Sequence, residues 1–227
     1  MNLDFTEDQK MLRTMARDFL SRECPKSLVR DLEESDLGYS PEIWKKMAEL
    51  GWQGIMIPEE YGGTGMTFFD LVLVIEEMGR NILPGPFLST VICASTILEA
   101  GTEEQKRKFL PKIAAGDMIL TLALTEPSAS WKPEHISVRA AVSGENYLID
   151  GTKLFVPDAH VANYLLVVAR TRENTKPEEG ITIFMVDAKS PGIQCESQLT
   201  MGLDNKCEVV FENAAVPKEN ILGNLNQ

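Results

Sequence analysis

Few residues of this sequence have the type and spacing that catalytic or metal-binding chemistry needs. His135 and His160 are the only histidines, and both lie in loop-like contexts without a partner pattern. No glycine-rich dinucleotide fingerprint precedes a predicted helix. The four cysteines, which lack the spacing of a metal site, are Cys24, Cys93, Cys195 and Cys207. We therefore expect reduced thiols, and neither a metal centre nor a Rossmann-type site.

Two short runs carry the strongest signals. In Pro58–Gly65, three glycines offer positions where a positive φ costs little, so the run is interpreted as a turn between helices and less readily as a ligand contact. Leu124–Pro127 comes near the middle of the chain, where a strand is expected to end. The Thr125 hydroxyl there could donate to a ligand, or it could simply cap the strand end.

Composition limits the class of protein. The 227 residues fit one large or two modest domains, with 44% hydrophobic and 25% charged residues. The net charge is −12, and residues 1–117 and 118–227 carry −7 and −5. An acidic surface excludes a nucleic-acid platform and disfavours anionic membranes. The sequence shows no basic region followed by an apolar stretch, as a secretory signal would, and the apolar run Leu71–Ile75 is too short for a membrane span, so we expect a cytoplasmic protein.

The first half of the sequence has the apolar spacing of helices. Thr6–Gln9 is a capping box, and Pro41 occupies the first position of a helix, where proline is tolerated. Glycines provide helix stops at Gly51 and Gly101. The predicted helices run from Thr6 through Leu20, from Ser40 to Leu50, from Thr67 to Gly79, from Phe87 to Ala100 and from Thr102 to about Gly116.

After Gly116 the apolar period changes to two, which is typical of strands. Alternation predicts a half-buried strand over Ile136–Val142, and Asp150-Gly151 is a hairpin-turn signal. Further strands are predicted at Tyr164–Ala169, Ile181–Val186, Ile193–Leu199 and Cys207–Phe211, with a loop at Arg172–Gly180. Helices followed by strands predict an α+β chain: a helical domain at 1–117 and an antiparallel β-barrel or sandwich domain at 118–227.

Seven segments, taken together and in this order, resemble an acyl-CoA dehydrogenase. They are Leu3–Gln9, Glu49–Gly65, Glu76–Arg80, Gly101–Lys106, Leu122–Pro127, Asp150–Lys153 and Val216–Gly223. The resemblance covers the whole chain and implies a flavoenzyme that binds FAD. It also implies removal of the α-proton of an acyl-CoA thioester and transfer of the β-hydrogen to the flavin as hydride.

The resemblance implies which residues contact the flavin. Leu122, Leu124 and Thr125 match the strand end whose amides and hydroxyl bond the flavin ring, where donors stabilise the negative charge of the reduced form. Phe155 and Val156 match the segment that walls the flavin, although both could instead be strand core. Pro157 stands where the family has Thr or Ser, so the hydrogen bond from that position is lost.

The substrate region departs from the family pattern. The resemblance implies that Ser130, Trp131 and Lys132 lie where the family holds acyl-CoA. Trp131 occupies the family's Ser position, and the neighbouring Ser130 could substitute for it. Lys132 could face a CoA phosphate or be a solvated surface residue. Asp204-Asn205 replaces residues that contact cofactor or ligand in many members, so that function is doubtful here.

The resemblance places the catalytic Glu on a third, helical domain, and no residue of this chain matches it. We therefore expect no catalytic base in this chain, which by itself would be inactive. Three interpretations remain open: part of an active dehydrogenase, a degenerate subunit of a heteromeric dehydrogenase, or a relative with other flavin chemistry on the same scaffold. The implied partners are acyl-CoA, an electron-transfer flavoprotein and further subunits of a homo- or hetero-oligomer.

Overall fold

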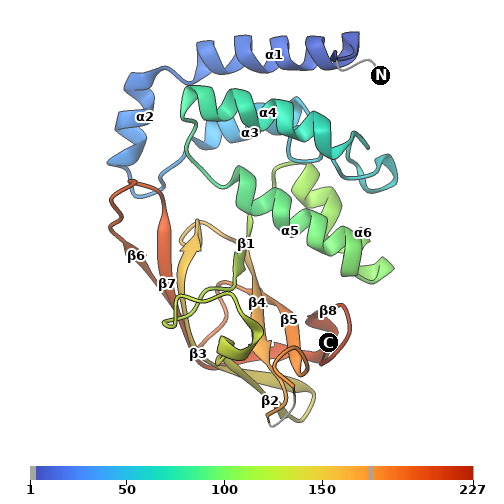
Figure 1. Cartoon of the computed structure of the whole chain (residues 1–227), viewed down its shortest axis with the longest axis vertical. Helices are drawn as coiled ribbons and strands as arrows, with labels where there is room; N and C mark the ends of the chain where they lie inside the picture. The colour runs from blue at the N-terminus through green and yellow to red at the C-terminus, as the bar shows by residue number, and fades with distance from the viewer. Residues whose placement is uncertain (1–3, 174–175, 227) are drawn as a thin grey trace. The chain divides into compact units, whose positions relative to one another are not determined.

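The protein consists of a helical part followed by a mainly antiparallel sheet, as the sequence predicts (Figure 1). The computed structural model describes residues 4–173 and 176–226. Packing divides the chain into two compact units. Residues up to Gly85 together with Leu110–Asp117 form the first, and Pro86–Phe109 together with Met118 onward form the second. The division into domains at residue 117 stays a prediction.

The first unit is built on four helices: α1 (Glu7–Glu23), α2 (Lys26–Glu33), α3 (Pro41–Glu49) and α4 (Phe68–Asn81). Thr6 and Thr67 each form a capping box, so the side-chain signals that predict α1 and α4 are real. α4 continues past the predicted stop at Gly79 to Asn81, and the residue that caps it, Ile82, has a φ of 54°. Helix α2 was not predicted.

The Pro58–Gly65 run between α3 and α4 forms a turn that depends on its glycines. Gly62 and Gly65 have φ values of 82° and 64°. Gly63 is required for a different reason: a Cβ there would collide with the carbonyl oxygens of Ile57 and Gly54. The structural interpretation of Pro58–Gly65 accounts for each of its glycines.

A buried carboxylate ties α1 to α4. The Glu77 side chain is fully buried, and its two oxygens accept hydrogen bonds from Arg13, Arg17 and Arg80 at 2.6–3.1 Å. The hydrogen bond from Arg17 is the main reason that the pKa of Glu77 falls to about 2, and it outweighs the opposing effect of burial. The folded state therefore favours the ionised form of Glu77.

We expect this network to make the helical unit acid-sensitive. The folded pKa lies below the unfolded one, so the stabilisation is complete above about pH 4.5 and is lost as the pH falls toward about 2. Glu77→Gln should cost on the order of 3 kcal/mol at neutral pH, because three arginines lose their buried partner. Urea denaturation as a function of pH checks this. Equal stability of Glu77→Gln and wild type at pH 7 would contradict it.

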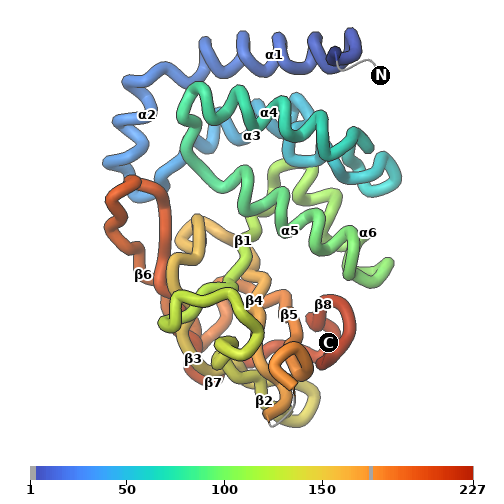
Figure 2. The backbone as a smooth tube through the Cα atoms, viewed as in Figure 1, coloured from blue at the N-terminus to red at the C-terminus, as the bar shows by residue number. Residues whose placement is uncertain are grey.

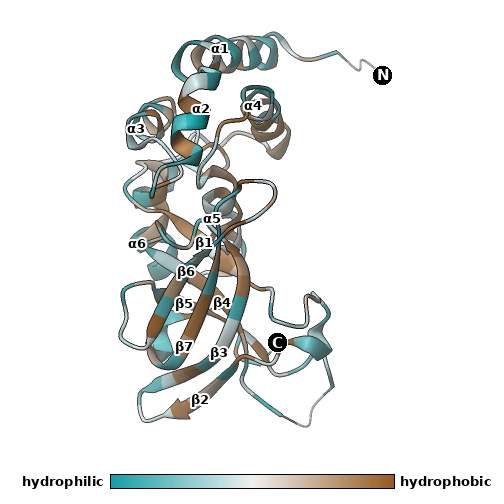
Figure 3. Ribbon diagram, turned by 90° about the vertical axis from the view of Figure 1, so that its left-hand side faces the viewer, coloured by the Kyte–Doolittle hydropathy of each residue, from teal (hydrophilic) through white to brown (hydrophobic). Residues whose placement is uncertain are grey.

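The second unit contains α5 (Phe87–Ala100), the first part of α6 (Glu103–Ala114) and eight described strands. The strands are β1 (Leu120–Ala123), β2 (Arg139–Ser143), β3 (Asn146–Pro157), β4 (Tyr164–Arg170), β5 (Ile181–Asp187), β6 (Ile193–Gln198), β7 (Lys206–Pro217) and β8 (Ile221–Leu222). Their order is β6-β7-β3-β2-β4-β5-β8, and β1 pairs with β4 in parallel. Apolar residues fill β4 and β5 (Figure 3).

The predicted hairpin turn at Asp150-Gly151 is wrong. Both residues lie inside β3, where the pairing with β7 shifts register between Ile149 and Gly151. At this shift β7 advances three residues, from Phe211 to Ala214, where β3 advances two, so the extra residue of the bulge lies on β7. The chain reverses at Gly144-Glu145 instead. The preceding alternation is also only partly a strand, since Ile136 and Val138 are buried before β2 begins and Val142 is exposed.

The predicted strands near 164–169, 181–186, 193–199 and 207–211 are all present as β4, β5, β6 and β7. The loop predicted at Arg172–Gly180 contains no helix or strand among the residues described there, and residues 174 and 175 lie outside the described part. Across residues 4–173 and 176–226, the helices are too short or too polar to cross a lipid bilayer.

Candidate functional site

A fully buried ion pair joins the Leu124–Pro127 run to the Lys153–Pro157 segment. Lys153 of β3 and Glu126, just after β1, are 0% and 1% exposed, and Lys153 Nζ lies 2.6 Å from Glu126 Oε1. A buried charge is tolerated only when it is paired and hydrogen-bonded. The hydrogen-bond partners of Glu126 and Lys153 therefore show which segments the pair holds in place.

The Glu126 carboxylate organises the chain that follows it. Its Oε2 accepts from the backbone N–H of Ser137 at 2.7 Å and from the Ser137 hydroxyl at 2.5 Å, and its Oε1 accepts from the Val138 N–H at 3.1 Å. Burial raises the pKa of Glu126, but the hydrogen bonds from Lys153 and Ser137 outweigh it and the pKa is lowered. Glu126 thus closes residues 126–138 into a loop through three hydrogen bonds.

The Lys153 ammonium adds a second connection. Besides Glu126, its Nζ donates to the carbonyl oxygen of Leu124 at 3.1 Å. Burial lowers the pKa of Lys153, and the neighbouring Glu126 carboxylate opposes that effect. The backbone N–H of Leu154 donates to the Thr125 carbonyl at 2.8 Å. Two bonds therefore fasten the Leu124-Thr125 strand end directly to β3. Figure 2 traces the backbone of β1 and of β3.

Phe155 lies in a bulge of β3. The pairing with β7 shifts register between Lys153 and Val156, and Phe155 lies in this bulge with a φ of 53°. A positive φ is strained for an aromatic residue and costs on the order of 1–3 kcal/mol. The Phe155 side chain is nevertheless 48% exposed, so the strain serves no core packing that would explain it. Such residues cluster at ligand sites.

The neighbours of Phe155 differ from it. Val156 is buried and pairs with Cys207, which makes its side chain core, while Pro157 pairs with Lys206 at the end of β3. Asp158 follows with a φ of 53°, and its Oδ2 accepts from the Ser89 hydroxyl of α5 at 2.7 Å. Burial raises the pKa of Asp158 despite that hydrogen bond. Val156 therefore offers no exposed side chain for a ligand contact at this position.

Thr125 is half-buried, and its hydroxyl has one hydrogen-bond partner among the described residues. Trp131 Nε1–H donates to Thr125 Oγ1 at 3.1 Å, and the Trp131 side chain is 77% exposed. A hydroxyl that accepts keeps its own proton for donation. Thr125 can therefore still donate to a ligand. Leu122 is half-buried in β1, where it pairs with Leu166 of β4, and Leu124 is half-buried just after the strand.

The three predicted substrate residues are brought together only in part. Ser130 Oγ accepts from the Lys132 N–H at 3.3 Å, so both belong to the same loop as Trp131. The Lys132 side chain is exposed, with its Nζ 4.0 Å from Glu134. Asp204 and Asn205 serve local structure: Asp204 Oδ1 accepts from the Thr200 hydroxyl at 2.6 Å, and the Asn205 carbonyl accepts from the Asp158 N–H at 3.0 Å.

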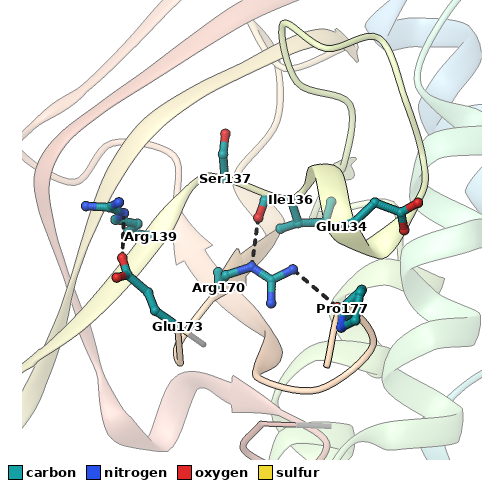
Figure 4. A pocket seen from close by; sticks show the side chains of 7 residues that line it. All are labelled: Glu134, Ile136, Ser137, Arg139, Arg170, Glu173 and Pro177. Carbon is teal, nitrogen blue, oxygen red and sulfur yellow. Dashed lines mark hydrogen bonds and ion pairs between the residues drawn. The ribbon is translucent and has the colours of Figure 1, made fainter. Parts of the chain in front are cut away.

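A hollow beside the 126–138 loop is lined by Glu134, Ile136, Ser137, Arg139, Arg170, Glu173 and Pro177 (Figure 4). Arg170 dominates it, but its guanidinium donates to four carbonyl oxygens, those of Ile136, Glu179, Pro133 and Pro177. Arg170 therefore fixes two loops in place, and we do not assign an anion site to it. The described residues hold no cluster of three or more potential metal ligands.

Sequence reasoning missed Glu126 and Lys153 as a pair. One signal could have found them: Tyr147, Ile149 and Lys153 all point to the buried side of β3, so a lysine on that side requires an acidic partner. The partner lies 27 residues away, which local patterns do not reveal.

Comparison with known proteins adds a second line of findings. The acyl-CoA dehydrogenase N-terminal domain profile matches residues 6–117, and the middle domain profile matches residues 121–214. The short-chain specific acyl-CoA dehydrogenase of Clostridium acetobutylicum is 34% identical over 229 residues, which cover 98% of this chain and 60% of that protein.

A subunit of a reductase complex and a solved crystal structure are also similar to this chain. The CarC subunit of the caffeyl-CoA reductase-Etf complex of Acetobacterium woodii is 35% identical, over 98% of this chain and 60% of its own length. The crystal structure of an acyl-CoA dehydrogenase from Geobacillus kaustophilus superposes with a TM-score of 0.89 at 29% identity, over 99% of this chain and 60% of that one. The chain thus spans about 60% of the length of these relatives.

Proposed function

The chain belongs to the acyl-CoA dehydrogenase family, an oxidoreductase family, and from this premise we propose that it forms the N-terminal and middle portion of an FAD-dependent enzyme. The proposed reaction is α,β-dehydrogenation of an acyl-CoA thioester. The observation that carries the proposal is the fastening of Leu124-Thr125 to the Phe155 bulge by the buried Lys153–Glu126 pair.

The chemistry of these residues fits a flavin. A flat aromatic heterocycle with polar edges is matched by an exposed aromatic side chain beside hydrogen-bond donors. Phe155 supplies the exposed ring, and Thr125 retains a hydroxyl proton. Leu122, Leu124, Thr125, Phe155, Val156 and Pro157 are the residues proposed to hold FAD. FAD, when bound, supplies the hydride acceptor.

The chain's own residues then act by binding and orientation. Lys153 and Glu126 hold the two segments at a fixed separation, so donors need not reorganise when negative charge develops nearby. Ser130, Trp131 and Lys132 are the proposed acyl-CoA contacts, from a loop that Glu126 closes. The proton-abstracting carboxylate is proposed to lie outside residues 1–227, since no residue here matches the family's base.

A degenerate, non-catalytic subunit of a heteromeric dehydrogenase is the second candidate. Pro157 favours it, because proline offers neither a backbone N–H nor a side-chain donor at this position. The similarity to a subunit of a reductase-Etf complex also supports partners of this kind, including an electron-transfer flavoprotein. A glutamate at the family's base position in the whole protein would favour the dehydrogenase. Its absence would favour the degenerate subunit or other flavin chemistry.

Replacing the Thr125 hydroxyl should weaken flavin binding. Thr125→Val keeps the shape of the side chain but removes both the donor and the acceptor for Trp131, and one net hydrogen bond is worth about 0.5–1.5 kcal/mol. We expect up to a ~10-fold rise in the Kd for FAD in the whole protein. Thr125→Ser is the matched control and should bind nearly as wild type does. Flavin fluorescence titration measures both, and equal Kd values for all three proteins would contradict the assignment.

A further inference from the structure

The second unit contains a pair of cysteines that the proposed function does not use. Cys195 lies on β6 opposite Val209, and Cys207 lies on β7 opposite Ser197. The two cysteines are thus diagonal neighbours on the same face of an antiparallel pair, within reach of each other. Cys195 is exposed and Cys207 is buried, and both are free thiols.

The two thiols are already in contact. They share a side-chain hydrogen bond, and the Cys207 Sγ also lies 3.8 Å from His160 Nδ1. The hydrogen bond from Cys195 and the neighbouring His160 lower the pKa of Cys207, whereas the same contact raises that of Cys195. The arrangement places an exposed sulfur beside a buried one on neighbouring strands, which is the pairing that disulfide formation needs.

We propose that Cys195 and Cys207 are an oxidation site at which a small peroxide converts the two thiols into a disulfide across the β6–β7 hairpin. Cys195 passes its proton to the neighbouring Cys207 sulfur, and the exposed Cys195 thiolate attacks the peroxide. The O–O bond breaks, and a sulfenic acid and an alcohol or water form. Cys207 then loses that proton to solvent, attacks the Cys195 sulfur as a thiolate and displaces hydroxide, which solvent protonates. Overall, two thiols and one peroxide give one disulfide, one alcohol or water, and one further water.

The sheet geometry permits this bond. β6 is the end strand of the sheet order and, among the described strands, pairs with β7 alone. A disulfide needs Cβ atoms about 3.5–4.5 Å apart, closer than an average diagonal pair. The other cysteines are poorer sites: Cys24 and Cys93 are buried in helical surroundings, and burial raises the pKa of both.

A Cys195–Cys207 disulfide would also affect β3, because β7 pairs with β3. Cys207 pairs directly with Val156, and the neighbouring Lys206 pairs with Pro157. A disulfide at Cys207 therefore tethers the strand that backs the end of β3. The inference concerns the thiols alone and stands whether or not this region binds flavin.

The test treats the purified 227-residue chain with hydrogen peroxide under native conditions. Thiols are then counted after denaturation, and the protein is digested without reductant for mass spectrometry. We expect the number of titratable thiols to fall from four to two and a cross-linked peptide pair containing Cys195 and Cys207. Dithiothreitol should restore all four.

Two variants sharpen the result. Cys195→Ser changes an exposed residue and should keep its three remaining thiols under the same peroxide dose. Cys207→Ser should accumulate a dimedone-reactive sulfenic acid at Cys195. The proposal is overturned if wild type keeps four thiols, if Cys195 alone is oxidised while Cys207 stays free, or if the product is a Cys195-linked dimer.

Discussion

Lys153→Met should lower the free energy of unfolding by about 3–5 kcal/mol, because it leaves the Glu126 carboxylate buried without its cation. Both side chains are almost fully buried, so solvent cannot compensate for the loss. The substitution also removes the bond to the Leu124 carbonyl. We expect weaker fastening of the Leu124-Thr125 segment in addition to the loss of stability. Urea denaturation of the purified chain measures the change.

A double variant distinguishes the effect of an unpaired buried charge on stability from the effect of the lost bond on FAD binding. Glu126→Gln with Lys153→Met removes both charges, and such replacements are often nearly neutral for stability. We expect it to be more stable than Lys153→Met alone and yet to bind FAD more weakly than wild type, since the bond between the segments is still missing. Lys132→Met is the control on an exposed lysine and should change stability by less than about 0.5 kcal/mol. If Lys153→Met also changed stability by less than about 0.5 kcal/mol, the account of the buried Lys153–Glu126 pair would be refuted.

The second large effect concerns activity. The purified 227-residue polypeptide should hold FAD weakly and show no acyl-CoA oxidation. General-base catalysis typically contributes about 10²–10⁴-fold, and no residue of this sequence matches the family's base. Pro157 removes one further bond, worth about 0.5–1.5 kcal/mol. The visible absorbance of the purified protein reports flavin content, and an artificial electron acceptor reports oxidation of acyl-CoA.

A yellow, stoichiometrically loaded and active polypeptide would contradict this prediction. It would mean that a base lies within residues 1–227 and that the site has been assigned wrongly. Glu126 would then be a poor candidate, because it is buried and its carboxylate oxygens accept four hydrogen bonds. The search would turn to exposed carboxylates of the second unit.

Helices with local signals were predictable from the sequence. Thr6 and Thr67 cap their helices through side chains that lie within three residues of the bonded amide. Helix α2 escaped because it is only eight residues long and begins after Pro25 without a side-chain cap. Its apolar contacts, through Val29 and Leu32, depend on tertiary packing.

Features of the site that depend on distant residues were not predictable. The resemblance singled out Thr125 and Phe155, but the left-handed backbone of Phe155 arises from a bulge against β7. Likewise, Asp150-Gly151 carries a hairpin signal, yet Gly151 packs against Val138 within a continuous strand. A positive φ can serve a bulge or a turn, and only the strand pairing decides which.

The most direct test of the flavin assignment is an amide chemical-shift titration of the isotopically labelled 227-residue chain with millimolar FAD. Weak binding suffices for this measurement, so it does not depend on the missing activity. We predict that the largest shifts fall on the amides of Leu122–Thr125 and Leu154–Val156, and that Thr125→Val reduces them. Shifts that leave both segments unchanged, or that concentrate on the helices of the first unit, would contradict the account.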